Sequence, residues 1–199
     1  MSDIICVTNR GLCSGNFLTR IEKIAKAKPK AIILREKDLN KEDYKILALK
    51  VMEICRKYDT PCILHNFADV AIELKAEFIH LPLHILQKMS DSEKVHFSVI
   101  GASCHSVDDA IEAEKLGCSY ITVGHIFDTE CKKGIAGRGL DFLKDVCNSV
   151  SIPAYAIGGI DKINFADVCK VGANGACIMS GIMRCDDVNM YLEGFQDEV

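Results

Sequence analysis

The fold is decided by the stretch EKLGCSYI, residues 114–121, and by its partial repeat CKVGANGA, residues 169–176. Each copy is typical of the end of a helix, followed by a glycine and then by a buried strand. Gly117 and Gly172 stand where a glycine with positive φ commonly ends a helix. The repeat therefore predicts the same helix–strand junction at two places in the chain.

Short apolar runs alternate with amphipathic segments along the whole chain, and no linker rich in proline, glycine or serine interrupts them. We expect strands at 4–7, 31–34, 61–64, 78–81, 98–102, 120–123, 154–157 and 175–179. Helices are expected at 17–27, 40–55, 68–74, 106–116, 140–150, 163–170 and 186–195, with a short or irregular one around Gln87–Asp91. Asn40 and Ser106 have the side chains of N-caps.

The strands lack alternating polarity, which is typical of parallel strands that are buried on both faces. Eight such strand–helix units predict a closed parallel sheet, so we expect a single-domain (β/α)8 TIM barrel over residues 1–199. A doubly wound open sheet is the alternative architecture.

Composition and charge exclude several classes of partner. The net charge is −4 and lysine and arginine form no block, so no nucleic acid is expected. No apolar run approaches the roughly 20 residues that span a bilayer, so no membrane partner is expected. Ser2-Asp3 leads into the first apolar run without the basic region of a signal peptide, and a cytoplasmic location is the expectation. A homodimer is left open.

The eleven cysteines are not spaced like the ligands of a metal. No two are separated by only two residues, and several lie in apolar runs, where a thiol packs as a small hydrophobe. We expect free thiols in a reducing compartment. His80 and His84 are the nearest candidate metal pair, but Pro82 prevents the helix that would align them.

Polar residues follow each expected strand, where (β/α)8 barrels form their active sites. They are Thr8 and Asn9, Arg35 and Lys37, His65 and Asn66, His80, Ser103 and His105, His125, Gly158 and Gly159, and Ser180 and Gly181. Cations, neutral donors and glycines dominate this set and carboxylates are scarce, which indicates an anion site.

The glycine-containing turns after the last two strands indicate where a phosphate binds. Gly158, Gly159, Ser180 and Gly181 bring backbone N–H groups to the loops that most often hold phosphate in this fold. The alternative is that these glycines serve only tight turns. A monophosphate substrate is therefore expected.

Arg35 and Lys37 stand two residues apart at the end of the second expected strand. Arg35 is able to grip a carboxylate with two parallel hydrogen bonds, and Lys37 adds a point charge. The alternative is ordinary surface charge.

The loop Gly124–Gly139, GHIFDTECKKGIAGRG, is longer than an idle connection needs to be. His125 follows the strand directly and is the one side chain here that ordinarily titrates near neutrality. The alternative is a histidine that is only structural. Thr129 and Lys132 are candidates to close over the phosphate, whereas Glu130 and Lys133 are expected to face solvent.

Six separated motifs resemble, in order and spacing, the thiamine phosphate synthase/TenI family of barrels. They are Arg35-Glu36-Lys37, His65-Asn66, Gly101–Ser106, Gly124–Gly134, Ile157–Ile160 and Gly172–Gly181. The resemblance implies one of two activities. The synthase joins a pyrimidine pyrophosphate to a thiazole phosphate with magnesium, and the TenI-type tautomerase aromatises a carboxythiazole phosphate.

The sequence departs from the synthase pattern at the metal ligands. The resemblance implies Asn-Asp after the third strand, where this chain has Asn66-Phe67, and a further aspartate after the fourth, where it has Ile85. Magnesium requires several hard oxygen ligands. Ile33 also replaces a glutamine of the synthases, and the Gly124–Gly134 loop resembles that of the tautomerases.

On these grounds a thiazole tautomerase that needs no cofactor or metal is the expected function. His125 would move the proton as base and then acid, Arg35 and Lys37 would hold the substrate carboxylate, and the glycine turns would anchor its phosphate. Asn66, Thr129 and Lys132 complete the expected substrate site. The alternative is a magnesium-dependent thiamine phosphate synthase, and a non-catalytic sensor of thiamine metabolites is a third hypothesis.

Overall fold

Eight parallel strands close into a barrel in the computed structural model, which describes residues 3–195. Each strand pairs with its neighbours in the sequence, and β8 returns to pair with β1, so that Cys6 lies beside Ile178. The strands are Ile4–Val7 (β1), Ala31–Leu34 (β2), Cys62–His65 (β3), Phe78–Pro82 (β4), Val99–Cys104 (β5), Tyr120–Gly124 (β6), Ala154–Ile157 (β7) and Gly175–Ile178 (β8). The expected TIM barrel is confirmed, and the open sheet is wrong.

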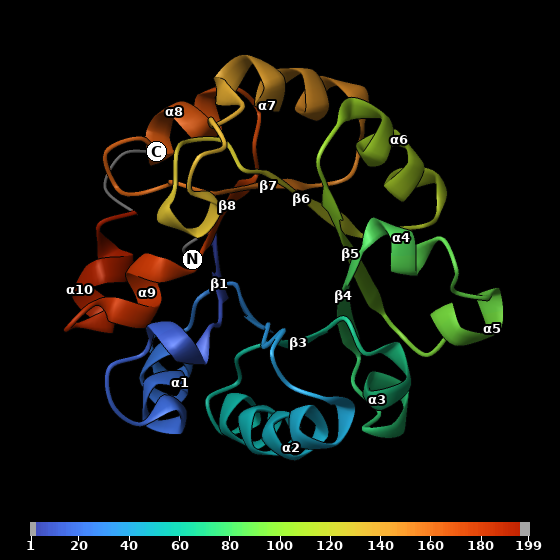
Figure 1. The fold of residues 1–199 in the computed structure, drawn as a ribbon, viewed down its shortest axis with the longest axis vertical. Coiled ribbons are helices and arrows are strands. Elements are labelled where there is room, and N and C mark those ends of the chain that lie inside the picture. Colours follow the sequence, from blue (N-terminus) through green and yellow to red (C-terminus); the bar gives the residue numbers. More distant parts are fainter. Residues whose placement is uncertain (1–2, 196–199) are drawn as a thin grey trace.

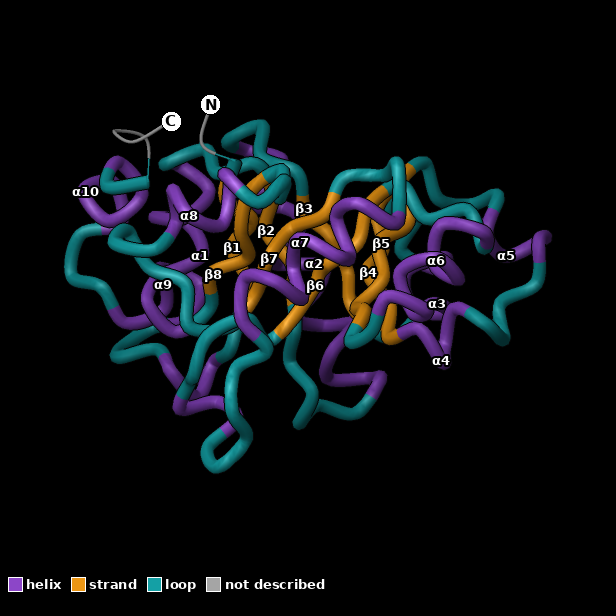
Figure 2. Tube along the Cα trace, turned by 90° about the horizontal axis from the view of Figure 1, so that it is seen from above, coloured by secondary structure: helices purple, strands orange, loops and turns teal. Residues whose placement is uncertain are grey.

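Helices form a ring around this barrel (Figure 1). They are Phe17–Lys26 (α1), Lys41–Lys57 (α2), Ala68–Glu73 (α3), Leu83–Leu86 (α4), Asp91–Lys94 (α5), Val107–Lys115 (α6), Gly139–Ser149 (α7), Phe165–Lys170 (α8), Ser180–Arg184 (α9) and Val188–Glu193 (α10), with 3-10 turns at Arg10–Leu12 (η1) and Glu130–Lys132 (η2). In side view, loops extend well beyond one end of the strands (Figure 2). Their length at that end leaves room for a site.

Local signals in the sequence set the ends of several helices. The side chain of Asn40 accepts a hydrogen bond from the N–H of Asp43 at 2.8 Å, and that of Ser106 accepts one from Asp109 at 3.0 Å, so both expected N-caps are confirmed. Gly117 and Gly172 have φ angles of +87° and +107°, as the repeat predicts. Glycine at these junctions turns the chain from the helix into the next strand without steric strain.

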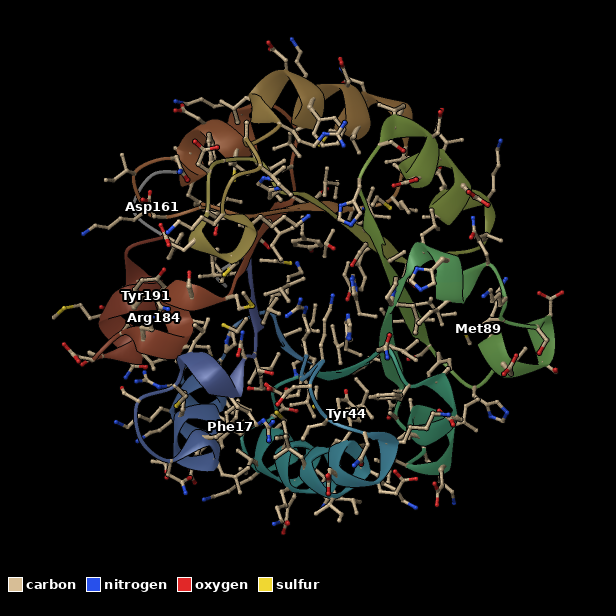
Figure 3. The ribbon with its side chains drawn as sticks, viewed as in Figure 1. Phe17, Tyr44, Met89, Asp161, Arg184 and Tyr191 are labelled. Carbon is tan, nitrogen blue, oxygen red and sulfur yellow. The ribbon has the colours of Figure 1, made fainter. Side chains whose placement is uncertain are left out.

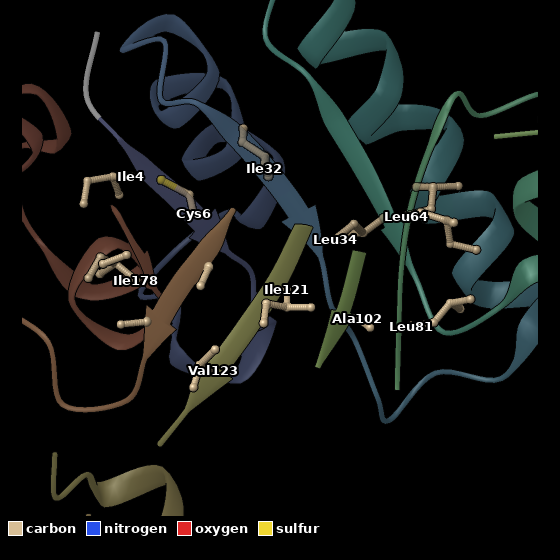
Figure 4. Packing of buried hydrophobic residues seen from close by; sticks show 14 of the residues in the cluster. Ile4, Cys6, Ile32, Leu34, Leu64, Leu81, Ala102, Ile121, Val123 and Ile178 are labelled. Atoms are coloured by element: carbon tan, nitrogen blue, oxygen red, sulfur yellow. The ribbon is translucent and has the colours of Figure 1, made fainter. Parts of the chain in front are cut away.

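Two apolar layers hold the barrel together. Side chains such as Ile4, Ile32 and Leu64 point outward and pack under the helices (Figure 4). A smaller cluster, which includes Val7 and Tyr155, lies inside the barrel. Both faces of the strands are buried, which explains why the apolar runs are uninterrupted.

The segment between β4 and β5 differs from the sequence expectation. A helix around Gln87–Asp91 is wrong, because those residues lie mainly between two shorter helices, α4 and α5. Pro82 ends β4 and stands at the N-cap of α4, and Ser90 begins α5 through a capping box with Glu93. These two start signals divide the segment.

The eleven cysteines are free thiols, and burial raises the pKa of Cys6 and Cys177. None of the helices between residues 3 and 195 combines the length and the apolar character of a membrane span.

Candidate active site

A cavity of about 640 Å³ opens at the carboxyl ends of the strands. Its volume is in the range of about 300–1,000 Å³ that is usual for small-molecule sites. Of the site residues expected from the sequence, eight line it: Arg35, Lys37, His125, Thr129, Lys132, Gly158, Gly159 and Ser180. Asn66 and Gly181 are not in its wall. The expectation that polar residues at the strand ends form the site is therefore correct for most, but not all, of these residues.

One wall of the cavity carries three cations. Arg35 and Lys37 follow β2, and Lys132 reaches the same cavity from η2. Burial lowers the pKa of Arg35, and burial together with the charges of Arg35 and Lys132 lowers that of Lys37. No ion pair involves any of the three among residues 3–195. These three side chains therefore form a positive region that no described carboxylate neutralises by an ion pair.

The nearby carboxylates are occupied elsewhere. Glu36 is buried, and its two oxygens accept hydrogen bonds from Thr8 Oγ1 at 2.6 Å and from the N–H of Arg10 at 2.9 Å. Asp109 does line the cavity, but it accepts the N–H of His105 at 2.7 Å. Glu36 thus anchors the β1–β2 end, and Asp109 stands alone as an acidic group in the wall.

The floor of the cavity is a hydrogen-bonded group around His80. Its Nδ1 lies 3.0 Å from the Tyr120 hydroxyl and its Nε2 2.9 Å from Ser103 Oγ. The ring of His65 is stacked on that of His80 with centroids 6.0 Å apart. Burial, followed by the nearby cation Arg35, lowers the pKa of His80 to about 3. Burial, then His80 and the cations, lowers that of His65 to about 2, so both rings are neutral.

Tyr44 of α2 fixes the ends of β2 and β3 that carry these groups (Figure 3). Its hydroxyl donates to the carbonyl of Leu34 at 2.8 Å and accepts the N–H of His65 at 2.8 Å. The ring of Phe67 packs against Tyr44 with centroids 5.0 Å apart. Sequence reasoning placed His65 at the mouth but gave it no role, and it gave Tyr44 none, because contacts between a helix and strand ends leave no local pattern.

His125 ties down the long loop that follows β6. It is buried, and its Nε2 lies 3.1 Å from the carbonyl oxygen of Ile135, to which it can only donate. The carbonyl of His125 accepts the N–H of Arg138 at 3.1 Å, and Asp128 accepts that of Gly137 at 2.7 Å. The loop, yellow in Figure 1, is thus closed on itself beside the cavity.

The glycines after β7 serve this loop as well as the cavity. Gly158 and Gly159 have φ angles of +100° and +66°. A Cβ on Gly158 would lie 2.3 Å from His125 Cβ, and one on Gly159 would lie 2.5 Å from the carbonyl oxygen of Asp128. The alternative that these glycines serve close packing therefore has direct support, although the two also line the cavity.

Backbone donors in the same wall are nevertheless free. No backbone acceptor among residues 3–195 takes the N–H of Gly159 or of Ser180, which is the first residue of α9. Gly181 has a different task, because a Cβ there would lie 1.8 Å from the hydroxyl of Tyr191 on α10 (Figure 3). The cavity wall thus offers N–H groups to an anion at Gly159 and Ser180.

The residues do not fit a magnesium ion held by the protein. Magnesium binds through carboxylates and other hard oxygens. In the part of the chain that the structure describes, no three histidine, cysteine or acidic side chains form a group able to hold a metal. Phe67 and Ile85 occupy the positions where the resemblance implies aspartates. The ring of Phe67 packs against Tyr44, and Ile85 packs against the core.

The fold and this cavity define a (β/α)8 barrel with a small-molecule cavity at the carboxyl ends of its strands. The family model described as "Thiamine monophosphate synthase" matches residues 4–182. The chain therefore belongs to the thiamine monophosphate synthase family, which is a family of enzymes.

Individual relatives agree with this assignment. The thiamine-phosphate synthase of Clostridium novyi is 33% identical over 189 residues, which cover 92% of this chain and 91% of the relative. That of Fusobacterium nucleatum is 34% identical and covers 96% and 93%. Among solved structures, the thiamine phosphate pyrophosphorylase from Pyrococcus furiosus has a TM-score of 0.82 and 27% identity, covering 97% of this chain and 93% of that one.

These relatives correct the expected function. The two relatives from Clostridium and Fusobacterium carry the name of the synthase, and the solved structure that of a thiamine phosphate pyrophosphorylase. The expectation of a thiazole tautomerase is therefore wrong, and the coupling reaction that was the alternative fits better. The tautomerase hypothesis depended on His125 as a proton carrier. In the structure one nitrogen of that ring is bonded to Ile135 within the loop, so the presence of the histidine is explained without proton transfer.

Proposed function

We propose that this enzyme joins a thiazole phosphate to a pyrimidine that carries a pyrophosphate, the reaction implied by the resemblance and by the names of its relatives. The observation that supports this most directly is the cavity, whose lining carries two kinds of anion-binding group. Arg35, Lys37 and Lys132 bring positive charge, and Gly159 and Ser180 bring free N–H groups. Phosphorylated substrates are bound by groups of both kinds.

The coupling forms one bond and breaks another. The thiazole nitrogen bonds to the methylene carbon of the pyrimidine, and the bond between that carbon and the pyrophosphate oxygen breaks, with its electron pair leaving on the pyrophosphate. Negative charge therefore grows on the leaving group in the transition state. Fixed positive charges at that point, such as Arg35 and Lys37, lower the barrier because they are already oriented before the bond breaks.

The neutral floor suits the rest of the substrates. His65 and His80 are uncharged, so they add no repulsion toward the positive charge that develops on the thiazole ring as its nitrogen forms the new bond. Both rings line the cavity. The nitrogens of His80 are already bonded to Tyr120 and Ser103, so the ring of His65 is the one that offers nitrogens to a heteroaromatic substrate. Thr129 also lines the cavity, on the loop that His125 holds. We give His125 a positioning role in this reaction.

The proposal is tested by incubating the purified protein with the pyrimidine pyrophosphate and the thiazole phosphate. We expect thiamine phosphate, measured as the fluorescent thiochrome after oxidation, and one pyrophosphate released for each coupling. Lys37→Met should lower kcat/KM by about tenfold or more, since a charge-assisted contact to the leaving group is lost. Lys133→Met is the matched control, because Lys133 is exposed and lies outside the cavity wall.

Absence of thiamine phosphate under any metal condition, from protein that is folded by circular dichroism, would overturn the proposed function.

A further inference from the structure

Three cations line one cavity, and no described carboxylate forms an ion pair with any of them. Arg35, Lys37 and Lys132 lie close enough for their charges to lower the pKa of Lys37, and no acidic side chain of residues 3–195 pairs with any of them. Like charges held together repel one another, and a bound anion would relieve that repulsion. The arrangement therefore favours the binding of an anion at these three side chains.

We propose that this enzyme binds its pyrophosphate-bearing substrate without a divalent ion held by protein carboxylates, and that Arg35, Lys37 and Lys132 supply the counter-charge. This inference rests on the proposed function and names how the same site handles the pyrophosphate.

The charges balance. A terminal phosphate group carries about 1.5 to 2 negative charges at pH 7, and the inner phosphoryl group carries one more, so the pyrophosphate brings about three. The three cations of the wall bring the same number. Arg35 presents a planar fork that matches two phosphate oxygens, and the two lysines are compact point charges on flexible stems. No further positive charge is needed to neutralise the ligand.

The oxygen ligands that would hold a divalent ion are not available in this wall. Glu36, the carboxylate nearest in sequence to the cations, is fully engaged by Thr8 and Arg10. Asp109 follows β5 and is bound to the backbone of His105. Within the described chain the acidic groups therefore leave the cation wall to the anion alone.

Binding of inorganic pyrophosphate, measured by isothermal titration calorimetry, tests the inference without requiring turnover. In excess EDTA we expect one pyrophosphate per chain, bound at least as tightly as with Mg²⁺ present, because the free anion and not its metal complex is the ligand. Lys37→Met and Lys132→Met should each weaken this binding by about tenfold or more. Lys133→Met, the exposed neighbour in the same loop, should leave it within about twofold.

A variant of Asp109, the acidic side chain in the cavity lining, distinguishes binding by the three cations from binding through a metal ion held by a carboxylate. Asp109→Asn keeps an oxygen for the N–H of His105 but loses the charge, and we expect no change in pyrophosphate binding with or without Mg²⁺. Binding that appears only with Mg²⁺, or a Mg²⁺-dependent gain that Asp109→Asn abolishes, would overturn the inference.

Coupling assays distinguish this inference from the function on which it rests. Thiamine phosphate formed in EDTA supports both. Coupling and pyrophosphate binding that both require Mg²⁺ would leave the proposed function standing and overturn the inference. Tight metal-free binding of pyrophosphate without coupling would overturn the proposed function and support the charge assignment.

Discussion

Acidification from pH 7 to pH 5 should remove a large part of the stability of this barrel, because two buried histidines must stay neutral in the folded state. The pKa of His80 is about 3 and that of His65 about 2, against 6.5 for an unperturbed histidine. Both side chains are almost fully buried, with residue exposures of 3% and 5%. Their neutral forms are favoured by burial first and then by neighbouring positive charge.

The sign and the size follow from proton uptake. Below pH 6.5 the unfolded chain binds protons at these two residues and the folded chain does not, so stability is complete above pH 6.5 and falls as the pH is lowered. Between 6.5 and 5 there are about 1.5 pH units, each worth about 1.36 kcal/mol for one group, so each histidine contributes a loss of about 2 kcal/mol. Together they remove about 4 kcal/mol from a stability that is typically about 5–15 kcal/mol.

Urea unfolding followed by circular dichroism at pH 7 and pH 5, at constant ionic strength, measures this loss. In His65→Gln and in His80→Gln the difference in free energy of unfolding between the two pH values should be smaller than in the wild type by about 2 kcal/mol. At position 80 the glutamine side chain retains a donor and an acceptor for Tyr120 and Ser103, the partners of His80. His96→Gln, at an exposed histidine, is the matched control and should keep the wild-type difference. If the free energy of unfolding depended on pH equally in the wild type and in both buried variants, the conclusion that His65 and His80 are neutral in the folded state would be refuted.

Three further predictions concern the loop, the core and the caps. His125→Ala should raise KM for the pyrophosphate-bearing substrate in the coupling assay, because the loop that carries Lys132 is released. His125→Gln should restore the wild-type KM, because glutamine is able to donate to the Ile135 carbonyl. No change of KM in either variant would contradict the positioning role of His125. Gly134→Ala should lower the free energy of unfolding by about 1 kcal/mol, because Gly134 has positive φ but space for a Cβ. Gly158→Ala should lower it by clearly more, because Gly158 has positive φ and no such space. Equal losses in urea titrations would contradict the close packing at Gly158. Ile121→Ala should cost about 2–5 kcal/mol in the same titrations and Asn40→Ala about 1 kcal/mol, and the reverse order would contradict the assigned core.

The barrel could be predicted from the sequence because its determinants are local. Apolar runs that lack alternating polarity, N-caps such as Asn40 and glycines such as Gly117 each act within a few residues. The segment after Pro82 was harder, because two start signals close together give two one-turn helices instead of a single longer one. The 3-10 turns η1 and η2 were also missed, since three residues are too few to show a period.

The candidate site was predictable in position but not in role. Residues that follow parallel strands converge at one end of the barrel, which is why Arg35, Lys37 and Ser180 line the cavity as expected. Asn66 does not line the cavity, although it follows β3 directly. Its φ angle is +72° and its N–H donates to the carbonyl of His80, so the chain turns away from the cavity at this residue. Hydrogen bonds between distant segments, such as that of His125 to Ile135, leave no trace in the sequence, and reading the histidine as a proton carrier led to the wrong activity.

Phe67 stands where the resemblance to the family implies an acidic residue, and its packing shows what it does there instead. Phe67 packs on Tyr44, whose hydroxyl joins β2 to β3 beneath Arg35 and His65. A carboxylate at that position would lose the aromatic contact with Tyr44, and with it part of the packing that holds the ends of β2 and β3. Phe67 itself does not line the cavity, so it acts on Arg35 and His65 only through this scaffold. The aromatic residue therefore serves the site by fixing the strand ends from which its cations and histidines extend.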